Sequence, residues 1–231
     1  MNNTSEAPSA TRGDATRESL IFSAIDVFGR DGFSAASTRA ISQAAGVNQA
    51  LISYHFGGKP GLYRAALRHI ADSVRSRLEP LLGAIETELW ANGGTITPER
   101  EAKQALELLQ RLTDAFVQML TSDESAPWAR MILREQQQPS EGFDILYEGI
   151  MNRMFTVTTK LVRRVRKGKA GEQQAKLMAV TILGQALVFR AARAAVLRHM
   201  EWDELKPAEV ETIKETLRHN VTAILETEKL L

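Results

Sequence analysis

Residues 37–59, STRAISQAAGVNQALISYHFGGK, restrict the fold of this chain more than any other stretch. Ser37 is a residue type that caps helix N-termini, and a short run of helix-forming residues follows it. Gly46 can adopt the left-handed conformation that ends such a helix without a Cβ penalty. Asn48 can cap a second short helix, which we expect over residues 49–55. The stretch therefore predicts two short helices joined by a turn of three or four residues.

Two short helices joined in this way have the spacing of a helix-turn-helix, whose second helix fits the major groove of DNA. The charge pattern agrees, because the chain has no carboxylate between Asp31 and Asp72. That window is the longest acid-free stretch of the chain, as expected of a surface that faces phosphates. Its cations are Arg39, Lys59, Arg64 and Arg68.

The composition of the whole chain limits the other possibilities. The net charge of its 231 residues is only +1, so the basic window indicates a small DNA-contacting patch rather than a general polyanion-binding surface. The absence of cysteine excludes disulfides and thiolate metal sites. No secretory signal pattern is visible, and no run approaches about 18 uninterrupted apolar residues. We therefore expect a cytoplasmic protein without membrane association.

Apolar periodicity predicts an all-α chain of about nine helices. Residues 1–13 are expected to form a disordered arm, residues 14–58 a three-helix unit with the helix-turn-helix, and residues 59–231 a second helical domain. We expect Asp14 to cap the first helix and Gly32 to stop it.

The second domain is expected to begin with a connecting helix near Lys59, which links the two units. Pro80 is expected to bend or end this helix, because proline removes a backbone hydrogen bond and clashes with the preceding turn. Further helices are predicted from Pro98, over 128–137, from Pro139 and Ser140 to about 166, over 172–199, and from Pro207.

The N-terminal pattern resembles the signature of TetR-type transcriptional regulators over about 50 residues. The matching positions are Ile21, Ala24, Phe28, Gly32, Thr38, Ile41, Ala45, Gly46, Val47, Ile52, Tyr54, His55, Phe56, Lys59 and Leu62. Pro60 departs from the pattern, where an acidic residue is common, but proline is tolerated in the first turn of a helix. Ser53 also departs, at a position where many members have an aromatic residue that touches bases.

The resemblance implies that Gln49, Ala50 and Ser53 face base edges. The amide of Gln49 is suited to bidentate pairing with adenine, and Ala50 to contact with a thymine methyl group. Arg39, at the start of the first helix of the pair, is expected to reach a guanine or a phosphate.

The resemblance further implies that Thr38, Tyr54, His55 and Lys59 hold the phosphate backbone, which sets register and affinity without reading sequence. Two alternatives remain open. Tyr54 or His55 caps the small core of the three-helix unit, or Thr38 serves only as a helix N-cap. The residues assigned to that core are Ile41, Ala45, Val47 and Ile52.

Aromatic and methionine side chains of the second domain can enclose an effector cavity. The candidates are Phe116, Met119, Met131, Phe143, Tyr147, Met151, Phe155 and Phe189, with Arg134, Glu135 and Gln185 as polar groups. Such stripes form ordinary cores more often than ligand cavities, so both interpretations stay open. The effector is unknown and is expected to be largely apolar or aromatic.

The chain lacks the motifs of common catalytic and metal sites. It has no HExxH, GxSxG or GxxxxGK[ST] pattern, and its histidines lack the spacing of helical metal pairs. We therefore expect no enzyme activity, no catalytic residue, no metal site and no cofactor.

A second resemblance concerns the second domain and implies a gene class. Arg134, Glu135, Gln136, Pro139, Ser140, Phe143, Asp144 and Tyr147 match the pattern of CecR-like TetR regulators. It implies control of genes for efflux or drug sensitivity, and catabolic genes are the alternative.

The last two helices, over 172–199 and from Pro207, either pack within their own subunit or form a dimer interface. The TetR-type resemblance implies the dimer. We expect a ligand-released repressor that binds a near-palindromic operator as a homodimer. Two rivals from other classes are a helical adaptor that binds a protein partner, and an enzyme or small-molecule carrier.

Overall fold

The computed structural model describes residues 12–91 and 97–226, and the regular elements in these ranges are all helical. The N-terminal unit contains α1 (Arg12–Ala35), α2 (Thr38–Ala44) and α3 (Ala50–Phe56). Residues 1–11 of the predicted arm lie outside the described part. Residues 12 and 13 are helical, so the arm cannot extend to residue 13 as predicted.

Local capping explains the three helices. Ser37 Oγ accepts a hydrogen bond of 3.0 Å from the amide of Ala40, and Asn48 Oδ1 accepts one of 2.8 Å from the amide of Ala50. Gly46, with φ of 67°, makes the turn between α2 and α3. The predicted helix-turn-helix is confirmed, with α3 beginning one residue later than expected.

The first helix differs from the prediction at both ends. Asp14 lies inside the first turn of α1 rather than at its cap, where its charge still favours the helix N-terminus. Gly32 has φ of 79° and ψ of 168°, so the helix is interrupted there as predicted, but helical residues follow it and α1 extends to Ala35.

The connecting helix α4 (Lys59–Ala91) runs through Pro80 without ending there. The alternative that Pro80 ends this helix is therefore wrong. The proline ring is exposed to solvent, whereas Leu78 and Leu82 on either side are each only 2% exposed. Burial of these two side chains holds the helix together where one backbone hydrogen bond is lost.

The middle of the second domain is more segmented than predicted. After α5 (Pro98–Thr121), a 3₁₀ turn (η1, Asp123–Ser125) leads into α6 (Ala126–Gln137). The next helix was expected to start at Pro139 and Ser140 and to run unbroken. Instead, α7 (Phe143–Leu146), a π-helical turn (η2, Tyr147–Met151) and α8 (Asn152–Val165) follow in succession. The predicted start is wrong because Ser140 bonds to Glu135 through both its amide and its hydroxyl.

The helix predicted over 172–199 is divided into α9 (Glu172–Ala191) and α10 (Arg193–Met200), which meet at 80°. Two residues before the break, the guanidinium of Arg190 donates to the carbonyls of Leu120 and Ser122, each at 2.5 Å, at the end of α5. The last helix, α11, spans Pro207–Glu226 and begins where predicted.

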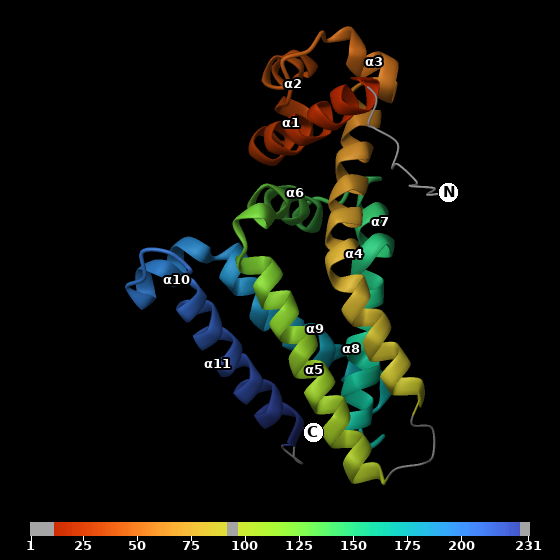
Figure 1. Ribbon diagram of the computed structural model, residues 1–231, viewed down its shortest axis with the longest axis vertical. Coiled ribbons are helices and arrows are strands. Elements are labelled where there is room, and N and C mark those ends of the chain that lie inside the picture. The colour runs from red at the N-terminus through yellow and green to blue at the C-terminus, as the bar shows by residue number, and fades with distance from the viewer. Residues whose placement is uncertain (1–11, 92–96, 227–231) are drawn as a thin grey trace, which may run out of the picture.

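One hydrophobic core extends through the described chain, from Leu20 in α1 to Leu225 in α11. Figure 1 shows α4 running from the three-helix unit along the second domain, where α5 packs against α8, α9 and α11. Helix α6 lies across the junction and packs on α1. No single described helix is long and apolar enough to cross a bilayer. By length and hydropathy, only the bent pair of α9 and α10 would be sufficient when the two helices are taken together.

Candidate nucleic-acid interface

Helix α3 presents one face to solvent and buries the other. Ile52 is 1% exposed and anchors the helix in the core of the N-terminal unit. Ala50, Ser53 and Tyr54 are exposed, and the exposed fraction of Tyr54 is 81%. Such exposure leaves these side chains free to contact a ligand as large as a DNA duplex. It also excludes Tyr54 from the core, which removes one of the two alternatives for this residue.

Two predicted contact residues bond to each other. Gln49 Nε2 donates a hydrogen bond of 2.8 Å to Thr38 Oγ1, which joins the start of α3 to the start of α2. Thr38 is the first residue of α2, whereas Ser37 provides the N-cap. The alternative that Thr38 is only an N-cap is therefore wrong. Arg39, the next residue, is exposed.

The remaining predicted phosphate contacts lie at the end of α3 and at the start of α4. His55 is half-buried, with its ring against Tyr54 at 4.9 Å and against Phe56 at 6.1 Å between centroids. Lys59 Nζ donates to the carbonyl of Ser34 at 3.2 Å and lies 4.8 Å from the centroid of the Phe33 ring. These contacts hold the Lys59 ammonium beside the helix-turn-helix.

The nearest acidic residue in sequence is already paired. Asp31 forms an ion pair of 2.7 Å with Arg30, and this hydrogen-bonded cation lowers the pKa of the Asp31 carboxyl. Its negative charge is thus balanced locally, and the acid-free window from residue 32 to residue 71 keeps a net positive charge.

Comparison with known proteins gives two family matches. The family described as "Bacterial regulatory proteins, tetR family" matches residues 20–66. The family described as "HTH-type transcriptional dual regulator CecR, C-terminal domain" matches residues 105–227, more than half of the chain. This chain is a TetR-family regulator of the CecR type. Both matches are to regulators of transcription, so the protein is a DNA-binding regulator and not an enzyme.

Individual relatives agree with this assignment. The dual regulator CecR of Shigella flexneri is 28% identical over 227 residues, which are 98% of this chain and 97% of the relative. RaaS, a transcriptional regulatory protein of Mycobacterium tuberculosis, is 26% identical over 72% of this chain and 67% of its own length. Both are named as helix-turn-helix regulators.

Solved structures agree in fold. AibR in complex with isovaleryl coenzyme A and operator DNA has a TM-score of 0.63 at 12% identity, covering 89% of this chain and 97% of AibR. A TetR-like regulator of Rhodococcus sp. RHA1 has a TM-score of 0.60 at 16% identity, covering 96% of this chain and 100% of that chain.

The residues predicted to line an effector cavity have varied surroundings in this regulator. Met131 is 1% exposed, in the core. Gln185 accepts a hydrogen bond of 3.3 Å from Asn220, and Arg134 lines a pocket of about 560 Å³ beside α1 and α4. The aromatic and sulfur-containing candidates that pack partly buried on the core are Phe116, Met151, Phe155 and Phe189, and Phe143 and Tyr147 stack with their centroids 5.9 Å apart. One effector cavity formed by these residues stays a prediction.

Two features of the regulator escaped the sequence analysis. A Cβ on Gly61 would lie 1.7 Å from the carbonyl oxygen of Phe56, so only glycine allows α3 to approach α4 this closely. The predicted polar group Glu135 is 2% exposed and accepts hydrogen bonds from Tyr63 Oη at 2.5 Å and from Ser140. For Gly61, the available sequence signal was an isolated glycine in a helical pattern. The Tyr63–Glu135 hydrogen bond had no such signal, because the two residues are 72 positions apart.

The same region joins the DNA-binding unit to the second domain. Arg134 donates to the carbonyls of Gly29 at 3.1 Å and of Arg30 at 2.8 Å, near the end of α1. Tyr63 on α4 and Glu135 on α6 add a buried link between the connecting helix and α6. A shift of α6 must therefore move or break contacts of both α1 and α4.

Among the described residues, no group of three or more histidine, aspartate or glutamate side chains is arranged to hold a metal ion.

Proposed function

We propose that this regulator represses transcription by binding a near-palindromic operator as a homodimer, and that a small, largely apolar or aromatic effector releases it. The observation that carries the proposal is the exposed outer face of α3 and of the residue before it, where Gln49, Ala50 and Ser53 present polar and methyl groups suited to base edges. Arg39 adds a further base contact. Phosphate contacts are assigned to Thr38, Tyr54, His55 and Lys59.

The exposed apolar face of α9 supports the dimer. Leu177, Val180, Leu187 and Val188 lie on this helix with exposed fractions between 43% and 65%. Large apolar side chains gathered on one exposed helix face indicate an interface. Together with α11 they can form a four-helix contact between two subunits, two helices from each. The two α3 helices would then enter successive major grooves about 34 Å apart.

The contacts around α6 support release by an effector. A ligand bound in the second domain that displaces α6 would change the position of α1 and α4 through Arg134, Glu135 and Tyr63. Coupling of this kind typically amounts to about 1–3 kcal/mol, or roughly 5- to 150-fold in operator affinity. The AibR complex, which holds both an acyl coenzyme A and operator DNA, supports a ligand-responsive mechanism in this fold.

The regulated genes are proposed by similarity alone. The match to the CecR C-terminal domain supports genes for efflux or drug sensitivity, and catabolic genes are the second candidate class.

Selection of bound sequences from random duplex DNA, at about 0.15 M salt, tests the proposal. A dimeric repressor should enrich one near-palindrome with half-sites one helical turn apart. A matched selection with Gln49→Ala should relax one base position in each half-site and leave the others unchanged. Enrichment of a single half-site would contradict the dimer, and absence of any enrichment would contradict sequence-specific binding.

A further inference from the structure

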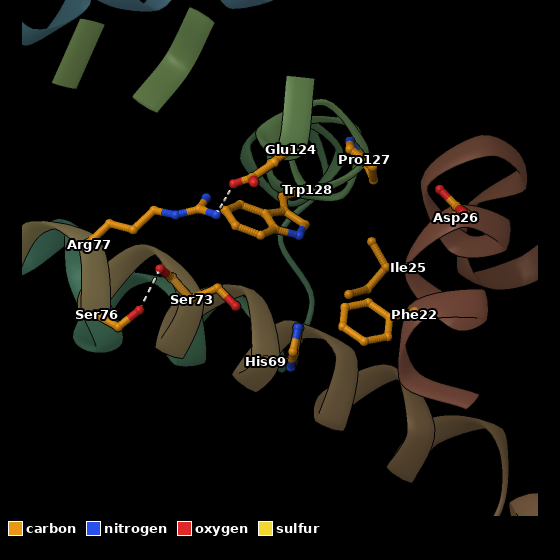
Figure 2. Close-up of a pocket in the computed structure, with 10 residues that line it drawn as sticks. All are labelled: Phe22, Ile25, Asp26, His69, Ser73, Ser76, Arg77, Glu124, Pro127 and Trp128. Carbon is orange, nitrogen blue, oxygen red and sulfur yellow. Dashed lines mark hydrogen bonds and ion pairs between the residues drawn. The ribbon is translucent and has the colours of Figure 1, made fainter. Parts of the chain in front are cut away.

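A pocket of about 440 Å³ lies where three parts of the molecule meet. Figure 2 shows that α1 contributes Phe22, Ile25 and Asp26 to it. The connecting helix α4 contributes His69, Ser73, Ser76 and Arg77, and η1 with α6 contributes Glu124, Pro127 and Trp128. The volume is within the range of about 300–1,000 Å³ that small-molecule sites occupy. The residues predicted for the effector cavity do not line it.

The walls of this pocket are aromatic. Phe22 is 49% exposed, which is unusual for a phenylalanine, and its ring meets that of His69 edge-on at 4.9 Å between centroids. Trp128 forms the opposite wall and is 8% exposed. A flat ring that enters between Phe22 and Trp128 would cover apolar surface that water now contacts and would gain aromatic contacts on two sides.

Polar groups in the pocket favour a hydrogen-bonding ligand. The indole nitrogen of Trp128 points toward the space between Trp128, Ile25 and His69 (Figure 2), and no hydrogen bond to another described residue satisfies it. An indole N–H is a donor only, so a ligand with an acceptor such as a carbonyl oxygen or a ring nitrogen would gain a hydrogen bond here.

The charges at the pocket disfavour an anion. Arg77, its one arginine, pairs with Glu124 and stacks over Trp128 with Cζ 4.6 Å from the ring centroid. Its charge is thus already balanced. Asp26 adds a second carboxylate, which lies 3.6 Å from Arg130 on α6. With Arg77 paired to Glu124 and Asp26 paired to Arg130, no unpaired arginine at this pocket is left to attract an anionic ligand.

We propose that this pocket binds an uncharged aromatic compound, most tightly one that carries a hydrogen-bond acceptor, and that the bound compound fixes α1 against α4 and α6. The site is separate from the effector cavity predicted within the second domain. Its regulatory consequence rests on the proposed function, because it acts on DNA binding only if α3 binds DNA. A ligand that contacts all three elements favours the one arrangement of the DNA-binding unit that forms the pocket.

A matched pair of fluorescent probes tests the site without DNA. N-phenyl-1-naphthylamine is uncharged, and 1-anilinonaphthalene-8-sulfonate has the same rings with one added sulfonate. The uncharged probe should bind at least about tenfold more tightly than the sulfonate, and one of its binding sites per chain should be lost in Phe22→Ala. Equal affinity of the two, or no saturable binding of the uncharged probe, would overturn the proposed ligand class.

Substitutions place the binding in this pocket. Phe22→Ala should weaken binding of the naphthylamine by roughly tenfold or more, as for an aromatic anchor, and Ser73→Phe should block the pocket by filling it. Leu133→Ala is the control, because Leu133 is an exposed apolar residue on α6 that lies outside this pocket. Unchanged binding in both Phe22→Ala and Ser73→Phe would overturn the site. Melting temperatures of all three variants establish that they fold.

A second probe tests the acceptor. Binding of 7-methoxycoumarin, whose lactone carbonyl can accept from the indole, should be weakened by Trp128→Phe, which keeps an aromatic ring and removes the N–H. Equal affinity for wild type and Trp128→Phe would overturn the role of the indole.

Operator or random-sequence DNA then separates this inference from the proposed function. A change in DNA affinity on adding the naphthylamine, absent in Phe22→Ala, supports the regulatory role. Probe binding through Phe22 with unchanged DNA affinity overturns the regulatory role alone. Failure to bind DNA with or without the probe overturns the proposed function. The probe measurements still test whether the pocket binds the proposed class of ligand.

Discussion

The side-chain amide of Gln49 donates a hydrogen bond of 2.8 Å to the hydroxyl of Thr38, so a residue proposed to read a base is held by one proposed to contact a phosphate. An amide presents a donor end and an acceptor end. Because Thr38 accepts from only one of the two N–H groups on Nε2, the second N–H and Oε1 remain available for the bidentate contact with adenine. The bond thus fixes the rotamer of Gln49 before DNA arrives, which lowers the entropy lost on binding.

Loss of the Gln49 amide should reduce specificity at one base position. We expect Gln49→Ala to weaken binding to the selected operator by about 1–3 kcal/mol and to leave random-sequence binding nearly unchanged. Thr38→Val keeps the shape of the side chain and removes only the hydroxyl, so it should produce a smaller loss at the same base position, together with a loss on all sequences from the missing phosphate contact. Titrations of each variant against operators altered at single positions measure both effects. Equal losses on operator and random DNA would contradict the assignment of Gln49 as a base-reading residue.

Lys59 should act on all sequences alike. Removal of one phosphate contact should reduce the slope of log affinity against log salt by about 0.9. We therefore expect Lys59→Ala to bind both operator and random DNA more weakly and with a shallower salt dependence. Lys103→Ala, which removes an exposed lysine from α5, is the control and should leave the slope unchanged. Because Lys59 also bonds to the carbonyl of Ser34, a melting curve must accompany the measurement.

The elements that the sequence predicts well depend on neighbours in the chain. Ser37, Gly46 and Asn48 act within three residues of their own positions, so residue type and spacing were sufficient to place α2, α3 and the turn between them. The exposed face of α3 then follows from helical periodicity once Ile52 is assigned to the core.

The elements that the sequence predicts poorly depend on distant partners. The bend at Ala192 coincides with hydrogen bonds from Arg190 to α5, about 70 residues earlier in the chain. Helix α4 continues through Pro80 because the side chains on either side of the proline are buried in the core. The link between Tyr63 and Glu135 spans 72 positions. Neither composition nor periodicity contains these pairings.

Gly61 should be intolerant of any side chain. A Cβ there would overlap the carbonyl oxygen of Phe56 at 1.7 Å, which forces α3 away from α4. We expect Gly61→Ala to lower the free energy of unfolding by about 1–3 kcal/mol. We also expect it to weaken DNA binding at temperatures where the variant is still folded.

The control lies on the same helix. A Cβ on Gly83 meets nothing within 4 Å, so Gly83→Ala should be neutral or stabilising by up to about 1 kcal/mol. Chemical denaturation of both variants provides the comparison. A Gly61→Ala protein as stable as Gly83→Ala would contradict the close approach of α3 to α4.

The buried Tyr63 should make stability depend on alkaline pH. Burial, and then the hydrogen bond to Glu135, raise the pKa of the Tyr63 phenol above its usual value near 10. The phenol in the unfolded chain therefore loses its proton at a lower pH than in the folded protein. The stabilisation is fully present below about pH 10 and is lost as the pH rises from there toward the folded-state pKa.

Tyr63→Phe isolates this effect. Between about pH 9 and pH 11, the free energy of unfolding should fall more steeply for wild type than for Tyr63→Phe. Tyr54→Phe removes the hydroxyl of a tyrosine that is 81% exposed, and it should follow the wild-type curve. Parallel curves for wild type and Tyr63→Phe would show that the phenol does not titrate differently in the two states.

The exposed face of α9 should determine the assembly. Leu187 is 46% exposed on the face proposed to pair with a second subunit, so Leu187→Glu places a charge where the dimer needs apolar contact. We expect this variant to be a folded monomer by sedimentation, since the side chain is already open to solvent within one subunit. Leu133→Glu, at a leucine on α6 that is 36% exposed, is the matched control and should remain a dimer.

Because a monomer offers only one recognition helix, Leu187→Glu should also lose most of its affinity for a two-half-site operator while keeping its affinity for a single half-site. A variant that stays dimeric would move the proposed interface away from α9.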